Sequence, residues 1–549
     1  MAGKSGNAFD FDLFKRLLRY TQPYKLTFYF VAIAAILLSG FAVARPYLTK
    51  LTIDESIVPK DGDNLLLYVG LMIGALVLEV VCQFSFIFFA NWLGQQVVRD
   101  IRVNLFEHML NFKKQYYDKS AVGRLVTRAV SDIETIASIF SQGLFMIISD
   151  LLKMLVVLGV MFFMSWKLTL LVLAVLPFIL YATRVFQKKM KVAFEEVRTQ
   201  VSNLNSFVQE RITGMKIVQI FGREETEYER FKDINDKHRN AWVRTVWYNS
   251  IFFPIAEISS SITIGLIVWF GGLRVVESNT LSLGVIIMFI ELAQMLFRPL
   301  RQIADKFNTL QMGMVAANRV FGILDTESTI ENNGSKEAKN LVGEIQFKDV
   351  RFSYIENEEV LKGISFEVKA GETIAIVGAT GAGKSTIINL LSRFYEIDSG
   401  SISVDNINIK DFTLKSLRNE IAVVLQDVFL FADTIMSNIT LNNESITEAE
   451  VIEAAKQIGV NKFIETLPNG YYYNVKERGV MLSSGQRQLI AFLRAYVSNP
   501  SILVLDEATS SVDSYSEQLI QEATDKITKG RTSIVIAHRL ATVKKADKI

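Results

Sequence analysis

The residues best suited to chemistry in this sequence are a glycine-rich loop and two acidic residues that follow a separate apolar run. The loop is Gly378-Ala-Thr-Gly-Ala-Gly-Lys-Ser385. It follows the continuous apolar run 373–377, which is typical of a buried central strand. Backbone amides of such a loop can surround a β-phosphate, helped by the amino end of the helix predicted from Lys384 onward. The pattern therefore predicts a nucleotide site.

Each residue type in the loop has its own task. Lys384 supplies a positive charge to the β- and γ-phosphates, and the Ser385 hydroxyl is suited to bind Mg²⁺. The alternative is a flexible glycine turn with no chemistry, which a strand before the loop and a helix after it disfavour. The other residues predicted to contact the phosphates are Gly378, Thr380, Gly381, Gly383 and Thr386.

The second apolar run, 501–505, ends in Asp506 and Glu507. Asp506 fits a carboxylate linked to Mg²⁺ at the carboxyl end of a strand. Glu507 is placed to polarise an attacking water as the general base. A solvated strand end is the alternative interpretation. The phosphate loop upstream favours the catalytic one, so the two patterns together predict hydrolysis of a nucleotide.

A third motif, Leu482-Ser-Ser-Gly-Gln486, opens a segment with helical pattern between the other two. The order of the three motifs resembles the nucleotide-binding domain of ABC transporters, whose signature is Leu-Ser-x-Gly-Gln. Ser484 stands where the family usually has glycine, and serine is small enough to leave the assignment intact. The resemblance implies that the signature of one subunit covers the γ-phosphate of ATP held by another. The residues concerned are Ser483, Ser484, Gly485 and Gln486.

The same resemblance assigns further roles one residue at a time. Tyr354 would stack on adenine, and Gln426 would reach Mg²⁺ and the attacking water. Asp513 belongs to a segment similar to the family's dimer-contact loop, and His538 to the switch that contacts the γ-phosphate. The implied cofactors are ATP and Mg²⁺.

The composition of the whole chain indicates that a membrane part accompanies the predicted nucleotide site. Half of the 549 residues are hydrophobic and the mean hydropathy is positive, which soluble domains rarely show. The formal net charge of +2 gives no support for nucleic-acid binding. Because Cys82 is the single cysteine, an intramolecular disulfide is excluded.

Six apolar segments are candidates to cross a hydrocarbon core ~30 Å thick, which takes about 20 apolar residues as helix. The third and fourth are separated by residues 165–167 alone, which predicts a tight hairpin. The long segments 94–134 and 184–244 are basic, so the positive-inside rule puts them and both termini in the cytosol. They resemble the two coupling segments of ABC exporters. The six segments are 26–44, 65–93, 135–166, 168–183, 248–273 and 281–298.

Charges within these segments need partners, a wet cavity or a substrate. Asp150 and Lys153 are three residues apart and can pair along one helix face, with substrate contact as the alternative. Glu79, Glu257 and Glu291 could meet cationic substrates or form hydrogen bonds between helices. Arg298 and Arg301 could bind anionic headgroups or extend to the interface.

The predicted fold class is an all-α membrane domain of six helices followed by an α/β P-loop NTPase domain. Residues 9–20 would form a helix along the membrane surface, with Phe11, Phe14, Leu17 and Leu18 on one face. A soluble amphipathic helix is the alternative. We expect a carboxyl-terminal tail beyond the last residue, as family members have. The predicted boundaries are 1–24 for the interfacial helix, 25–324 for the membrane domain, 325–342 for a linker and 343–549 for the nucleotide-binding domain.

The resemblance covers the whole chain and implies an ATP-driven exporter or flippase of an amphipathic lipid or drug, similar to the lipid A flippases and multidrug half-transporters. A peptide or toxin exporter is the alternative, and a soluble ABC ATPase without transport is a third. Lys384, Gln426, Glu507 and His538 are all present, so a homodimer suffices, with a heterodimer as the other arrangement. The expected location is a bacterial inner membrane, among membrane lipids, with the ATPase in the cytoplasm.

Overall fold

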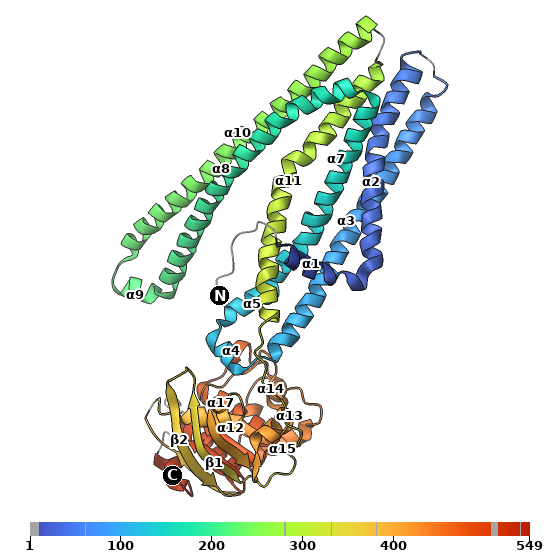
Figure 1. Ribbon diagram of the computed structural model, residues 1–549. Coiled ribbons are helices and arrows are strands. Elements are labelled where there is room, and N and C mark those ends of the chain that lie inside the picture. The colour runs from blue at the N-terminus through green and yellow to red at the C-terminus, as the bar shows by residue number, and fades with distance from the viewer. Residues whose placement is uncertain are drawn as a thin grey trace. The chain divides into compact units, whose positions relative to one another are not determined.

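The computed structural model describes residues 10–60, 62–278, 281–330, 332–379, 381–506, 514–537 and 540–549. The chain divides into two compact units (Figure 1). The first holds Met1–Leu110 and Val122–Thr326, and the second holds Asn111–Ala121 and Glu327–Ile549. A short segment that interrupts the first unit in sequence therefore belongs to the second in space.

Long helices build the first unit. Within the described residues, five helical segments are long and apolar enough to cross a membrane. The sixth predicted segment, 281–298, falls in α11 and is not among those five; the side chains of residues 300 and 301 lie outside the described part. The predicted hairpin at 165–167 is confirmed, because Ser165 is extended and its hydroxyl accepts the Leu168 amide. The long helices are α2 (Lys25–Thr52), α3 (Leu65–Leu110), α7 (Phe145–Met164), α8 (Trp166–Thr213), α10 (Glu224–Ser278) and α11 (Leu283–Leu324).

The third predicted segment, 135–166, lies mostly in one of these five helical segments, Val122–Met164. Within it a wider, π-helical turn, η4 (Ile139–Leu144), joins α6 (Ile133–Ser138) to α7. At this turn α11 comes very close, since a Cβ added to Gly313 would lie 2.1 Å from Ile139 Cγ1. The missing side chain at Gly313 is therefore what allows the two helices to pack. The remaining short helices of this region are α5 (Val122–Thr127) and η3 (Arg128–Asp132).

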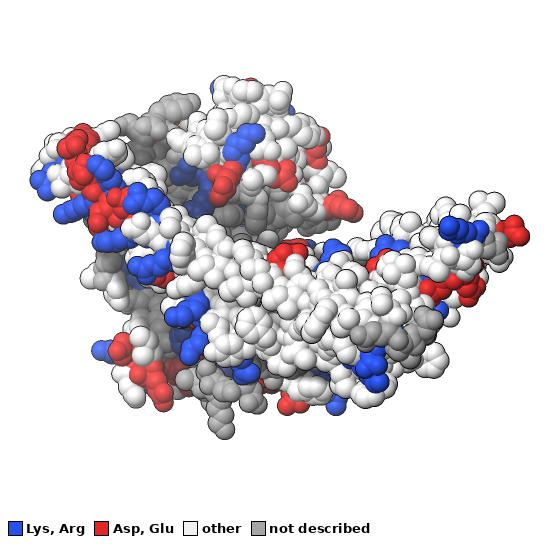
Figure 2. All heavy atoms as spheres, turned by 90° about the horizontal axis from the view of Figure 1, so that it is seen from above, with Lys and Arg blue, Asp and Glu red and all other residues white. Residues whose placement is uncertain are grey.

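Helices α8 and α10 run side by side to a short connecting helix, α9 (Met215–Ile220), and separate from the other helices toward that end (Figure 1). Near their opposite ends they join a common core with α7 and α11, in which Leu168, Ile267 and Phe289 are fully buried. Uncharged side chains dominate the middle of the long helices in the view of Figure 2, as expected for surfaces that face lipid.

The amino-terminal helix α1 (Phe11–Arg19) packs against protein as well as facing outward. Leu17 is fully buried, whereas Phe11 is 71% exposed. Arg16 donates two hydrogen bonds of 2.7 Å to the Asp325 carboxylate at the end of α11. Its guanidinium also lies 4.3 Å from the centroid of the Phe321 ring. The Arg16 guanidinium holds the pKa of the Asp325 carboxyl below its usual range.

The predicted pair between Asp150 and Lys153 is wrong. Asp150 forms its ion pair with Lys306 of α11, and both side chains are largely buried. Spacing along one helix favours the nearer lysine, but α11 brings an ammonium directly opposite the carboxylate. The Lys153 ammonium is therefore left to interact with other charged groups.

The second unit contains a four-stranded antiparallel sheet in the order β2-β1-β4-β5 and a four-stranded parallel sheet in the order β3-β8-β7-β6. Strands cover the segments 345–350 and 364–368, and the predicted strand at 501–505 is confirmed as β7. The segment expected to be a central strand forms β3, which is last in the parallel order of named strands but is bridged on its other side by Lys548 at Ile374, so it has a neighbour on both sides. The strands are β1 (Ile345–Ser353), β2 (Glu359–Val368), β3 (Thr373–Ile376), β4 (Ser399–Val404), β5 (Ile407–Asn408), β6 (Ile421–Val424), β7 (Ile502–Asp506) and β8 (Thr532–Ile536).

Two hydrophobic cores organise this unit. One includes Phe347, Leu390 and Ile536 between the strands and α12. The other includes Ile439, Ala455 and Leu489 among the helices from α14 to α18. The α-helices that follow β3 are α12 (Lys384–Leu391), α13 (Leu414–Asn419), α14 (Ile435–Thr440), α15 (Glu448–Ile458), α16 (Asn461–Glu465), α17 (Ser484–Val497), α18 (Ser514–Thr528) and α19 (Leu540–Lys545).

We expect Gly313→Ala to lower the thermal unfolding temperature of the purified protein in nanodiscs, because the new methyl group would overlap Ile139 and overpacking costs about 1–3 kcal/mol. Gly322→Ala is the matched control on the same helix, since nothing lies within 4 Å of a Cβ there. Combining Gly313→Ala with Ile139→Ala should recover part of the loss. Equal unfolding temperatures for the two glycine variants would contradict the close approach.

Candidate nucleotide site

The phosphate loop connects β3 to α12 through backbone conformations that favour glycine. Gly381 and Gly383 have φ angles of 84° and 88°. Gly383 is the residue that caps α12, and a Cβ there would lie 2.9 Å from Leu361 Cδ2. Gly378 directly follows the apolar strand segment, and Thr380 lies outside the described residues. The loop thus turns sharply enough to direct backbone amides toward an anion.

Lys384 folds over this loop. Its ammonium donates to the carbonyl oxygens of Gly378 and Ala379, each at 2.9 Å. The positive charge is therefore held above the loop amides by two neutral carbonyls, without a carboxylate partner among the described residues. Phosphate oxygens are stronger acceptors for an ammonium than carbonyls are, so the side chain can exchange these bonds for a bound anion.

The two groups predicted to hold Mg²⁺ lie together. The Ser385 hydroxyl donates to Asp506 Oδ2 at 3.2 Å, and Asp506 is buried at the carboxyl end of β7. Hydroxyl and carboxylate oxygens are the hard ligands that Mg²⁺ prefers, so the residues fit the ion. Gln426 comes two residues after β6, whose last residue pairs with Leu505 beside Asp506. Its side chain is exposed at this same edge of the sheet, and no hydrogen bond among the described residues joins it to the pair.

Tyr354 lies beside the first turn of α12. Its hydroxyl donates to Thr386 Oγ1 at 3.2 Å and accepts from Asn389 Nδ2 at 3.4 Å. Its ring is perpendicular to the rings of Phe352 and Tyr395, with centroids 4.8 and 5.0 Å away. This cluster holds an aromatic ring next to the loop that is predicted to bind phosphates. The adenine contact itself remains a prediction.

The signature motif forms the amino end of α17. The Ser483 hydroxyl accepts the Gln486 amide at 3.2 Å, while Gln486 Oε1 accepts the Ser483 amide at 2.9 Å. This capping box leaves the amides of Ser484 and Gly485 pointing from the helix end, where the helix dipole favours an anion. No hydrogen bond or ion pair among the described residues connects this helix end with the phosphate loop.

Four predicted site residues lie outside the described residues: Thr380, Glu507, Asp513 and His538. Glu507 follows the buried Asp506, and His538 follows Ala537 at the end of β8, the strand between β3 and β7. Their roles as base, dimer contact and γ-phosphate switch remain predictions.

The second unit also contains α4 (Lys114–Lys119), which belongs to the first predicted coupling segment. Lys114 Nζ donates to Asn389 Oδ1 at 3.3 Å, and the Tyr395 hydroxyl donates to the Asp118 carboxylate. Burial raises the pKa of Tyr395 well above its usual range, and the hydrogen bond to Asp118 adds to the shift. The hydroxyl is therefore a proton donor at physiological pH.

Asn389 and Tyr395 were missed by the sequence analysis. Asn389 bonds both Lys114 and Tyr354, so it connects α4 with the tyrosine beside the phosphate loop. It lies four residues after Ser385 on α12, and this spacing is the signal that could have found it. The partner on α4 could not be found in this way, because it is distant in sequence.

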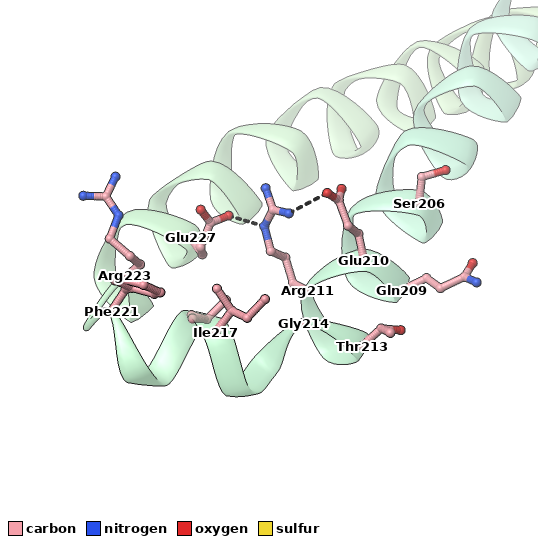
Figure 3. A pocket seen from close by; sticks show the side chains of 11 residues that line it. Ser206, Gln209, Glu210, Arg211, Thr213, Gly214, Ile217, Phe221, Arg223 and Glu227 are labelled. Atoms are coloured by element: carbon pink, nitrogen blue, oxygen red, sulfur yellow. Dashed lines mark hydrogen bonds and ion pairs between the residues drawn. The ribbon is translucent and has the colours of Figure 1, made fainter. Parts of the chain in front are cut away.

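Helix α9 lies within the second predicted coupling segment, next to an open cavity of about 1020 Å³. Arg211 lies between Glu210 and Glu227, so it joins the end of α8 to the start of α10 (Figure 3). Ile217 and Phe221, by contrast, are 65% and 72% exposed. Exposed apolar side chains at the end of a helix pair, next to ion pairs that join the two helices, are typical of a surface that binds another protein. We call the α9 end of this helix pair the α9 tip.

Comparisons with known proteins match both units. Residues 28–300 match the family described as ABC transporter transmembrane region, and residues 361–510 match the family described as ABC transporter. An ATP-dependent lipid A-core flippase of Idiomarina loihiensis is 36% identical over 98% of this chain and 92% of its own length. A putative multidrug export ATP-binding/permease protein of Staphylococcus aureus is 35% identical over 98% and 94%. An uncharacterized ABC transporter ATP-binding protein of Bacillus subtilis, YknV, is 35% identical over 97% and 89%.

We expect Tyr395→Phe, which removes one hydroxyl, to preserve basal ATP hydrolysis while reducing its stimulation by transported molecules about threefold to tenfold. The net contribution of one intramolecular hydrogen bond, about 0.5–1.5 kcal/mol, sets this scale. Tyr473→Phe is the control elsewhere in the same unit. Unchanged stimulation in Tyr395→Phe would show that the contact with α4 does not carry the coupling.

Proposed function

We propose that this chain, which belongs to the ABC transporter family, is an exporter or flippase of an amphipathic molecule and works as a dimer. It is a multi-pass membrane protein that contains both the transmembrane region and the ATPase domain of that family. It is an ATP-hydrolysing transporter of the half-transporter type.

The observation that carries the proposal is the division of the nucleotide site. Lys384, Ser385 and Asp506 lie together at the phosphate loop and the end of β7, whereas no hydrogen bond or ion pair among the described residues joins the amino end of α17 to them. A triphosphate exposes oxygens on all sides, so one surface alone leaves part of its charge uncovered. The start of α17 in a second copy supplies amides and a helix dipole for that side. Two ATP molecules would then hold two nucleotide units together.

The shape of the first unit supports a second copy. Toward α9, the α8 and α10 pair departs from the remaining helices of its own unit (Figure 1). Ile217 and Phe221 are exposed at that tip, where the surrounding solvent is aqueous. We infer that the tip docks on the nucleotide unit of the partner, which would bury these side chains and transmit movement.

Within the closed dimer the residues act as follows. Lys384 and the loop amides neutralise the charge of the β- and γ-phosphates, and Tyr354 stacks on the adenine ring. Ser385, Asp506 and Gln426 would hold Mg²⁺, which draws charge from the phosphates. Glu507 takes the proton of the attacking water, and His538 contacts the γ-phosphate. Loss of the bridging phosphate lets the units separate, which resets the helices.

For the cargo, the charges inside the membrane unit favour an anionic headgroup. Lys153 of α7 is half-buried, and Asp150 already pairs with Lys306. A charge at this depth costs about 2.5–3.5 kcal/mol unless it is compensated, so an anionic lipid would stabilise the excess. Arg301 was also predicted here, but its side chain lies outside the described residues. The charged groups that act on Lys153 are Glu79, Asp150, Arg298 and Arg45.

A hydrophobic cation is the second candidate, favoured by Glu291. Its Oε2 atom is buried without a hydrogen-bond partner among the described residues. A carboxylate in that position attracts a cation or a proton. The names of the similar proteins include both a lipid flippase and a multidrug exporter, so they support both candidates. For the location we propose a bacterial inner membrane with the nucleotide unit in the cytoplasm, supported by the basic segments on that side.

The cargo proposal predicts that a lipopolysaccharide precursor stimulates ATP hydrolysis in nanodiscs, and that Lys153→Ala raises the half-maximal lipid concentration about tenfold. Lys167→Ala, at the exposed turn between α7 and α8, is the charge-matched control and should behave like the unmodified protein. Stimulation by hydrophobic cations that disappears in Glu291→Gln would instead establish the second candidate. Stimulation by neither class would favour a peptide cargo.

The dimer proposal predicts that Glu507→Gln retains ATP binding and traps the closed state. The glutamine cannot accept the water proton, so hydrolysis should fall by about 10²–10⁴-fold. Distances between spin labels on the two nucleotide units report closure, and Glu517→Gln is a control on α18. Turnover near the unmodified rate, or a protein that transports as a monomer, would refute this mechanism.

A further inference from the structure

A cleft of about 440 Å³ lies between the end of α1 and the cytosolic part of α3. From α1 and the turn η1 (Gln22–Tyr24) it receives Arg19, Tyr20 and Pro23. From α3 it receives Arg99, Asp100 and Asn104. None of these residues belongs to the nucleotide site or to the charges proposed to contact cargo.

The depth of the cleft follows from α3. Its apolar run ends near Leu93, and Arg99 comes six residues later, about 9 Å along a helix. The headgroup layer is on the order of 5–8 Å thick on each side of the hydrocarbon core, so a tilted helix places Arg99 close to the lipid phosphates. Trp92 and Tyr24 pack edge to face with centroids 5.8 Å apart, which is typical of the aromatic belt at the interface.

The charge in the cleft is positive. Arg19 and Arg99 are both exposed, and within the described part of the chain neither forms an ion pair. Asp100 contributes the opposing charge, and its Oδ2 atom accepts the Tyr24 hydroxyl at 3.0 Å. Two guanidinium groups against one partly engaged carboxylate favour an anion, and guanidinium groups bind phosphate oxygens well because of their planar donor geometry.

The surface next to the cleft is apolar and suited to acyl chains. Leu26, near the start of α2, is 87% exposed, and Phe84 of α3 is 68% exposed. Between the two helices Phe30 packs against Phe89 at 4.8 Å, and Phe88 packs against Phe89 at 5.2 Å. A charged cleft at phosphate depth is therefore continuous with an aromatic face that extends into the hydrocarbon.

From this juxtaposition we propose that the cleft between α1 and α3 binds the phosphate of an anionic glycerophospholipid of the cytosolic leaflet, as a lipid site separate from the transported cargo. The acyl chains lie along α2 and α3. The site depends on the chain spanning a membrane and does not depend on which molecule is exported.

The cleft is connected to the end of α11. Tyr20, one of its lining residues, stacks on Phe321 with centroids 6.0 Å apart. Arg16, one turn earlier on α1, is bound to Asp325. A lipid that holds Arg19 and Arg99 together therefore stabilises the position of α1 against the helix that leads toward the nucleotide unit. Bound lipid would therefore stabilise the packing of α1 against the end of α11.

Native mass spectrometry of the full-length dimer, titrated with phosphatidylglycerol or phosphatidylcholine, tests the proposal. The unmodified protein should retain phosphatidylglycerol in preference to phosphatidylcholine. The double variant Arg19→Ala/Arg99→Ala should lower the apparent affinity for phosphatidylglycerol about tenfold or more, because each surface arginine contributes to attraction of an anionic lipid. Lys15→Ala/Lys25→Ala removes the same charge from exposed positions outside the cleft and should leave the affinity unchanged.

A phosphatidylglycerol with a photoreactive headgroup gives a second measurement on the unmodified protein, which does not depend on variants that fold. Its crosslinks should map to peptides of α1 and of α3 around residues 99–104. Equal losses in the two double variants would show a general effect of surface charge and overturn the site. Equal retention of both lipids, or crosslinks confined to other helices, would overturn it as well.

Discussion

The negative charge of a triphosphate is the constraint on which this architecture depends. One surface of the nucleotide unit offers Lys384, the loop amides and the pair of Ser385 with Asp506. The other complementary surface is the amino end of α17, which no hydrogen bond or ion pair among the described residues joins to the first. Backbone amides and helix dipoles act over short distances, so in the proposed mechanism each ATP is covered by surfaces of two units. The proposed dimerisation then follows from electrostatics, and so does its reversal when a phosphate is lost.

In the proposed mechanism, small polar contacts next to that site contribute to coupling. Asn389 is hydrogen-bonded to both Tyr354 and Lys114, and Tyr395 joins the same aromatic cluster to Asp118. These bonds are local, each worth on the order of 1 kcal/mol, and they attach α4 to α12. We propose that α4 moves with α12 when nucleotide binds, and that the α9 tip, next to the ion pairs of Arg211, is a second point of attachment.

The sequence predicted those parts whose chemistry is local. A phosphate loop is specified by consecutive residues, and the turn at Ser165 by one capping side chain, so both appear where expected. The ion pairs were not predictable, because helical periodicity identifies the face of a residue but not its neighbour across an interface. Asp150 meets Lys306, and Arg16 meets Asp325, far away in sequence. The same holds for the close approach of Gly313 to Ile139, which joins two helices that are distant in sequence.

Basic side chains occur in the membrane unit at two depths, and their energetics differ. Arg19 and Arg99 lie where water and headgroups compete for them, so each contributes only about 1 kcal/mol of attraction to an anionic lipid. Salt screens such charges, since the Debye length is about 8 Å at physiological ionic strength. Lys153 is half-buried among apolar helices, where screening is weak and an uncompensated charge costs about 2.5–3.5 kcal/mol. The charge of a surface arginine is therefore stable without a bound ligand, whereas the charge of Lys153 requires a compensating negative charge. The lipid site is therefore inferred from the cleft and its apolar border, and the cargo site from the half-buried charge of Lys153.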